Sequence, residues 1–165
     1  SQTTMEEPGR AIPSPDSAPN EKLLFLRENM VHLTNQLSMP VIEVALVISK
    51  FIRIVIESLT KAAASSGEDL PTSLLESRPL DPENTEYAAR ISVESFPLEN
   101  LINRVDEDRM DILDTLIRTV LNESQLEFVH ALQEFREWES EIRGQLSRVS
   151  SPGGLFSPLD LGDDF

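Results

Sequence analysis

Apolar residues recur at helical spacing in four stretches of the chain, which predicts four main helices. In the first, residues 20–37, the apolar positions lie alternately three and four apart, the spacing of a coiled-coil seam. Asn20 is a suitable N-cap, and the Glu21 carboxylate suits the positive end of the helix dipole. Leu24 and Val31 widen the seam, whose members are Leu23, Leu26, Met30, Leu33 and Leu37.

The second stretch, residues 41–64, is apolar around most of its circumference. Pro40 suits the first position of a new helix, and the run is too long and too irregular for a β-strand. Its longest uncharged run is six residues, far short of the roughly 20 that span a bilayer. Its charged residues share one narrow stripe: Glu43, Lys50, Arg53, Glu57 and Lys61. We expect the face of Ile48, Ile52 and Ile56 to form either the central core or a subunit contact.

The third and fourth helices are predicted at residues 98–121 and from residue 124 to about 149. An acidic cluster that includes Asp106 and Asp108 interrupts the third and marks a possible break. Ser124 and Glu127 have the spacing of a capping box, which predicts the start of the fourth helix. That helix carries apolar residues seven apart: Phe128, Phe135, Ile142 and Val149.

Two residues of the fourth helix are candidates for partner contacts. Glu139 occupies a seam position, where Arg136 and Arg143 can shield it. It marks either an exposed edge of the seam or a polar contact that sets the register with another helix. Trp138 lies beside the seam and is either a core residue or an interface anchor.

Three segments are too rich in proline, glycine and polar residues to join a core. Residues 1–19 are expected to form a disordered arm, and residues 65–97 a long connection with one short helix starting near Asp81. Residues 150–165 are expected to form a disordered acidic and apolar tail that docks in a partner's groove. Its apolar residues are Leu155, Phe156, Leu159, Leu161 and Phe165. Ser-Pro pairs make Ser14, Ser151 and Ser157 possible phosphorylation sites.

The expected fold is therefore all-α: an antiparallel helical bundle of four main helices with coiled-coil-like seams, a long connection between the second and third helices, and disordered termini. The bundle domain covers residues 20–149.

Composition then restricts the chemistry. The 165 residues carry a net charge of −15 and no cysteine. The negative charge argues against direct binding of nucleic acid or of anionic membranes. The lack of cysteine excludes disulfides, thiolate nucleophiles and cysteine-ligated metals. His32 and His130 lack metal-ligand spacing, and no catalytic or phosphate-binding motif is present, so we expect no catalytic residues, metal or cofactor. No secretory signal is visible, which favours an intracellular location in cytoplasm or nucleus.

These features favour a non-enzymatic interaction protein: a subunit, adaptor or assembly factor that forms homo- or hetero-oligomers through its helices and its tail. Two alternatives remain open. The acidic tail suits a transcriptional or nuclear regulator, and the net charge suits an acidic nucleic-acid mimic that inhibits a DNA-binding protein.

Overall fold

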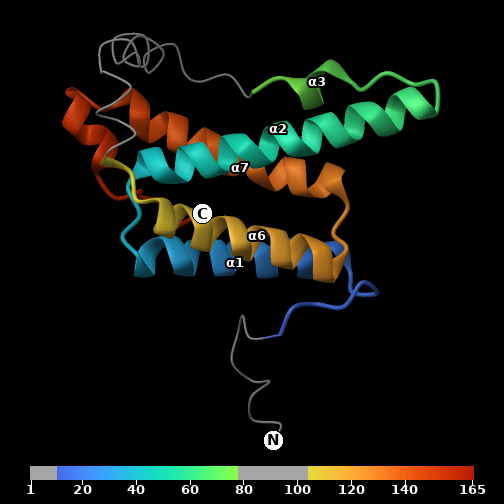
Figure 1. Cartoon of the computed structure of the whole chain (residues 1–165), viewed down its shortest axis with the longest axis horizontal. Coiled ribbons are helices and arrows are strands. Elements are labelled where there is room, and N and C mark those ends of the chain that lie inside the picture. Colours follow the sequence, from blue (N-terminus) through green and yellow to red (C-terminus); the bar gives the residue numbers. More distant parts are fainter. Residues whose placement is uncertain (1–10, 78–103) are drawn as a thin grey trace, which may run out of the picture.

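The computed structural model describes residues 11–77 and 104–165, and these residues form an all-α bundle of four main helices, as the sequence predicts. The same described residues also form a four-residue helix and a short 3₁₀ helix (Figure 1). The elements are α1 (Pro19–Gln36), α2 (Val41–Ser65), α3 (Thr72–Leu75), α6 (Glu107–Ser124), α7 (Phe128–Ser147) and η3 (Pro152–Phe156).

The bundle consists of two antiparallel helix pairs. In Figure 1, α2 lies beside α7 and α1 lies beside α6. The α2–α7 pairing is the most extensive, and at its centre the rings of Phe51 and Phe135 lie 5.8 Å apart. All four helices contribute to one core, which includes Leu26, Met30, Val47, Phe51, Leu113, Ile117, Leu132 and Phe135. Within the described residues, no helix is long and apolar enough to cross a membrane.

The chain turns from α1 into α2 where the sequence predicts. Ser38 has a positive φ of 48°, Met39 is completely buried, and Pro40 precedes the first residue of α2. The N-cap of α1 lies two residues before the predicted one. Ala18 rather than Asn20 is the N-cap, because Pro19, whose fixed φ suits the first turn, already belongs to the helix.

The predicted capping box at Ser124 is wrong. Ser124 is the last residue of α6, where its buried hydroxyl donates to the Val120 carbonyl (2.7 Å) and accepts from the Leu126 amide (3.2 Å). Gln125 then adopts a left-handed conformation with φ 56°, and α7 begins only at Phe128. The serine therefore closes one helix instead of opening the next.

The acidic cluster does mark a helix boundary. Asp106 caps α6, because its carboxylate accepts from the amides of Asp108 (2.9 Å) and Arg109 (3.2 Å). The neighbouring acids then lie at the positive end of the helix dipole, which favours this start. The expected helical residues 98–103, the helix expected near Asp81 and residues 1–10 of the arm lie outside the described residues.

The structure also differs from the expectation of a disordered segment at residues 150–165. Leu155 and Leu159 are buried, and main-chain hydrogen bonds join Val41 N to Ser157 O (2.8 Å) and Leu159 N to Met39 O (2.9 Å). The leucines find apolar surface on the chain's own helices, a long-range contact that a segment without helical periodicity cannot reveal in sequence. We call residues 152–165 the strap.

Candidate functional site

Two adjoining hollows lie between α1 and the strap. One, of about 400 Å³, is lined by Leu24, Arg27, Glu28, Val31, His32, Asn35 and Phe165. The other, of about 300 Å³, is lined by Val31, Asn35 and most of the strap from Leu159 to Phe165. Because Val31, Asn35 and Phe165 line both, the hollows form one continuous depression, which we call the α1 groove.

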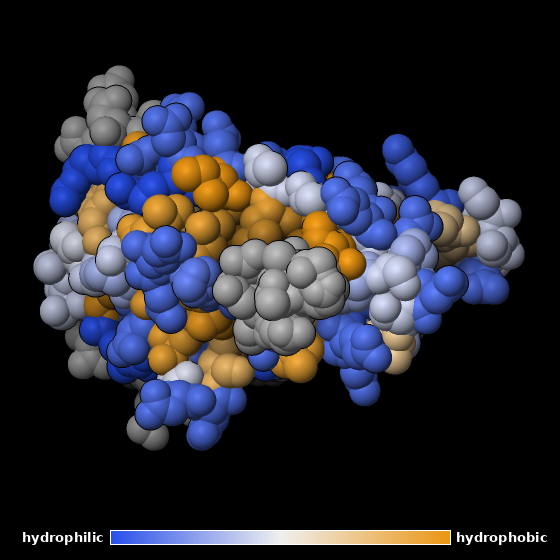
Figure 2. Space-filling model, turned by 90° about the horizontal axis from the view of Figure 1, so that it is seen from below, coloured by the Kyte–Doolittle hydropathy of each residue, from blue (hydrophilic) through white to orange (hydrophobic). Residues whose placement is uncertain are grey.

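The larger hollow of the α1 groove has a mainly apolar surface that reaches the outside of the molecule, whereas the smaller hollow is mainly polar. Leu24 is 56% exposed, and Val31 is half-buried. On α6, the neighbour of α1 in the bundle, Ile112 is 47% exposed. In Figure 2, apolar residues gather over the middle of the face that α1 and α6 form, with hydrophilic residues around them. Large apolar side chains left in water in this way are typical of protein-binding surfaces.

Arg27 lies in the wall of the groove and is held by two carboxylates of α7. Its Nε and Nη2 donate to the two oxygens of Glu134 at 2.7 and 3.0 Å, and Nη2 also donates to Glu137. The hydrogen bonds that Arg27 donates to Glu134 are the main cause that raises the pKa of Arg27, against the opposing effect of burial. This bidentate arrangement fixes the plane of the guanidinium group.

Phe165, in the strap, places its ring between Arg27 and Trp138. The Arg27 guanidinium carbon lies 4.4 Å from the ring centre, and the Trp138 ring meets Phe165 edge to face at 5.0 Å and 85°. Trp138 is completely buried, and its Nε1 donates to Glu134 (2.9 Å). Glu134 therefore orients both Arg27 and Trp138, two residues that contact the Phe165 ring. We call Arg27, Glu134 and Trp138 the aromatic clamp.

A second ionic cluster lies inside the bundle. Glu43 is 0% exposed and accepts two hydrogen bonds from Arg109, at 2.9 and 2.7 Å, and one from the amide of Asp106. The hydrogen bonds that Arg109 donates to Glu43 raise the pKa of Arg109. The sequence placed Glu43 on a charged stripe. In the structure its carboxylate can be buried because Arg109 and the amide of Asp106, the N-cap of α6, donate hydrogen bonds to it. The cluster joins α2 to α6 and opens into none of the hollows described above.

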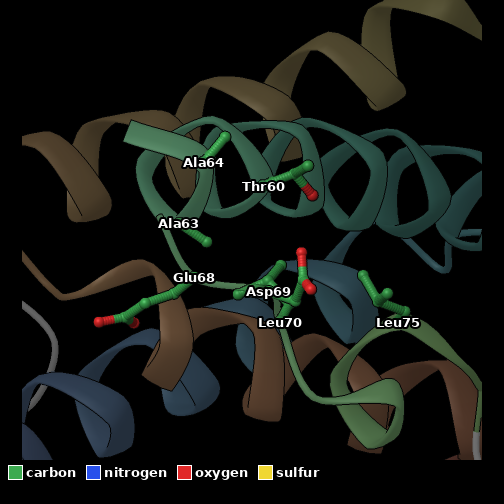
Figure 3. Close-up of a pocket in the computed structure, with 7 residues that line it drawn as sticks. All are labelled: Thr60, Ala63, Ala64, Glu68, Asp69, Leu70 and Leu75. Atoms are coloured by element: carbon green, nitrogen blue, oxygen red, sulfur yellow. The ribbon is translucent and has the colours of Figure 1, made fainter. Parts of the chain in front are cut away.

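A third hollow, of about 310 Å³, lies where α2 ends. It is lined by Thr60, Ala63, Ala64, Glu68, Asp69, Leu70 and Leu75, and in Figure 3 the Asp69 carboxylate points toward it while Glu68 points away. None of the lining residues is a base or a histidine. In the described part of the chain, no group of three histidine or acidic side chains could hold a metal ion.

The predicted contact residues of the helices lie mostly inside the bundle. Ile48, Ile52 and Trp138 are buried in the core, and Ile56 packs against it half-buried. Glu139 is half-buried: it accepts from Arg136 (3.0 Å), as its sequence spacing suggested, and from the distant Ser77 (3.0 Å).

The predicted contact residues of the tail divide into two groups. Leu155 packs against Ile42, and Phe156 lies beside them. The guanidinium carbon of Arg104 lies 3.9 Å from the centre of the Phe156 ring. Leu159, Leu161 and Phe165 pack on the main core. The serines of the three Ser-Pro pairs, Ser14, Ser151 and Ser157, are all exposed.

Sequence reasoning did not identify the α1 groove or the clamp. The sequence spacing assigned Leu24 to the widened apolar stripe of the first helix, whereas the structure leaves it 56% exposed, so no sequence signal marked the groove. The clamp had no sequence signal, because Arg27 is separated from Glu134 by 107 residues and from Phe165 by 138.

Comparisons of the chain with protein-family models, with curated proteins and with solved structures find no match. What the protein does must therefore be inferred from its own residues.

Proposed function

We propose that this chain is a non-enzymatic interaction protein, a subunit, adaptor or assembly factor of a larger complex, and that it binds a partner protein through the α1 groove. The observation that carries the proposal is the larger hollow of the groove: an open, mainly apolar depression lined by a leucine that is more than half exposed. Burial of one leucine side chain contributes roughly 1.5 to 3 kcal/mol, so a partner that covers Leu24 and its neighbours gains a useful part of its affinity there.

The proposed partner is a different protein rather than a second copy. A chain with a net charge of −15 repels its copies, and this repulsion opposes self-association unless a large apolar interface compensates. In the intact protein, Ile48, Ile52 and Trp138 support the bundle from inside. We therefore propose that these three residues do not contact the partner and affect binding only by maintaining the shape of the surface.

The test is a matched pair of surface substitutions. Leu24→Glu places a charge in the groove, whereas Leu46→Glu places one at an exposed position of α2, where the leucine is 39% exposed. Both proteins should keep the wild-type thermal midpoint. Affinity capture from the native source, quantified by mass spectrometry, should lose a partner with Leu24→Glu and keep it with Leu46→Glu. Equal recovery of every partner by both variants would refute the proposal.

A further inference from the structure

We infer that the α1 groove recognises a partner segment that carries an aromatic side chain flanked by lysine or arginine, and that this ring enters the aromatic clamp in place of Phe165. The inference rests on the proposed function and adds to it the chemistry of the partner. Phe165 is then a ligand supplied by the chain itself, which a better-matched segment displaces.

The clamp is organised independently of the ring that it holds. Two carboxylates fix Arg27, and Glu134 also fixes the indole of Trp138. A guanidinium group and an indole ring held in place in this way offer cation–π and edge-to-face contacts to any aromatic ring of suitable size. Little conformational freedom of the clamp remains to be lost on binding, which favours affinity.

The end of the strap is attached lightly. Its hydrogen bonds to the bundle occur between Ser157 and Asp160, where Gln145 contacts both the Pro158 carbonyl (3.0 Å) and the Asp160 amide (2.8 Å). Within the described residues beyond Asp160, the strap has one long hydrogen bond to the helices, from Arg27 Nη1 to the Phe165 carbonyl (3.4 Å). Displacing the last residues therefore breaks little besides the contacts of the ring and of Leu161.

The strap is also poorly matched in charge to its site. It carries Asp160, Asp163 and Asp164, whereas the groove and clamp contain the carboxylates of Glu28, Glu134 and Glu137 against one guanidinium, that of Arg27. Repulsion between carboxylates of the strap and of this surface disfavours the strap, and bases at the same positions would replace that repulsion by attraction.

The lysine and arginine residues of α1 and of its neighbour α6 have partners inside the protein. Lys22 donates to the Pro15 carbonyl, and Arg109 and Arg118 pair with Glu43 and Asp114. Among the acids of α1, Glu21 and Glu28 are exposed. The surface offered to a partner is therefore apolar with an acidic rim, which complements a segment with an aromatic anchor and basic flanks.

The test uses three synthetic nine-residue peptides and the intact chain. The first reproduces residues 157–165 with 4-nitrophenylalanine at the position of Phe165, so that a ring seated in the clamp quenches Trp138, the single tryptophan. The second carries in addition Asp160→Lys, Asp163→Lys and Asp164→Lys. The third is the lysine peptide with alanine in place of the aromatic residue, and it is added as a competitor of the second.

We expect the lysine peptide to quench most of the Trp138 emission and to bind about tenfold more tightly than the aspartate peptide at low salt, with the difference shrinking as salt increases. The alanine peptide should not compete. Glu28→Gln should weaken the lysine peptide and leave the aspartate peptide unchanged or tighter. Glu57→Gln, at an exposed position of α2, is the control and should change neither.

Phe165→Ala supplies a second measurement, because removing the competing ring should strengthen binding of both nitrophenylalanine peptides. If this variant melts below the assay temperature, the titrations of the wild-type chain alone test the inference.

Equal affinity for the lysine and aspartate peptides would overturn the inferred charge preference. Competition by the alanine peptide, or binding without quenching of Trp138, would show nonspecific attraction and overturn the clamp as the site. Loss of a partner by Leu24→Glu together with these results would leave the proposed function standing and this inference refuted.

Discussion

At the scale of single residues, local spacing predicts local contacts and fails for distant ones. Arg136 pairs with Glu139 three positions away, as the sequence indicated. Glu43 looked like a member of a solvent-facing stripe, yet it is completely buried against Arg109, 66 residues further along the chain. The sequence left two interpretations open for Trp138 and for Glu139. The pattern of one helix does not show which other helix packs against it, and that packing decides whether a residue is in the core or at the surface.

The Glu43–Arg109 pair yields the first prediction. Arg109→Met should destabilise the protein by about 3 kcal/mol, because Glu43 then remains buried without its counter-charge. Arg118→Met is the matched control, since Arg118 pairs with Asp114 at a half-exposed site and its removal should cost about 1 kcal/mol or less. Urea denaturation at pH 7 measures both. Equal losses for the two variants would mean that burial of Glu43 carries no special energetic weight.

Asp114 yields a prediction about pH. Burial alone would raise the pKa of this carboxyl, but hydrogen bonds from Lys50 and Arg118 outweigh it and lower the pKa below its usual 3.8. A group with a lowered pKa in the folded state stabilises the protein above the unfolded-state pKa, and this contribution is lost as the pH falls through the folded-state value. Asp114→Asn should therefore destabilise at pH 7 and have a smaller effect near pH 3. Urea denaturation of both proteins at the two pH values checks this, and an effect that does not shrink in acid would contradict it.

At the scale of elements, hydrophobic periodicity predicts the helices well and the junctions less well. α2 was expected at residues 41–64 and is found at Val41–Ser65. Asp106 caps the start of α6 where the acidic cluster suggested a break. Ser124 was assigned to the wrong helix, because a serine with a glutamate three residues later fits a capping box in sequence whether or not the chain turns there. The side chain instead donates to the Val120 carbonyl at the end of α6, and the left-handed residue Gln125 follows it in the turn.

This turn gives a prediction with an internal control. Ser124→Ala should cost about 1 to 2 kcal/mol, because the Leu126 amide loses its acceptor in a buried turn. Ser65 makes the same bond to the carbonyl four residues earlier, but at the exposed end of α2. Ser65→Ala should accordingly change the free energy of unfolding by less than about 0.5 kcal/mol. A comparable loss in both proteins would show that the hydroxyl of Ser124 does not organise the α6–α7 junction.

At the scale of the whole molecule, the sequence predicts a four-helix bundle but not the attachment of the strap. The strap lacks any helical repeat, so its leucines and phenylalanine looked available to a partner. In the structure they cover the chain's own core and form one wall of the α1 groove. The location of the candidate site therefore follows from tertiary packing, which brings residues from the two ends of the described chain together.

Truncation of the strap tests this packing. Removal of residues 152–165 should destabilise the bundle by about 3 kcal/mol or more, since it uncovers apolar surface under Leu155, Leu159 and Phe165. For a domain of this size that lowers the thermal midpoint by roughly 10 °C. Removal of residues 1–10, a polar stretch with no apolar stripe, should leave the midpoint unchanged. A strap deletion that melts like the intact chain would show that the strap is not part of the folded unit.

The most direct test of the α1 groove as a binding surface is photocross-linking from a single position. The chain is prepared with p-benzoylphenylalanine in place of Leu24, and separately in place of Leu46 on α2, and each is irradiated in an extract of the native source. A partner that occupies the groove should be cross-linked from position 24 and not from position 46. Adducts that form from position 46 alone, or equally from both positions, would contradict binding at the α1 groove.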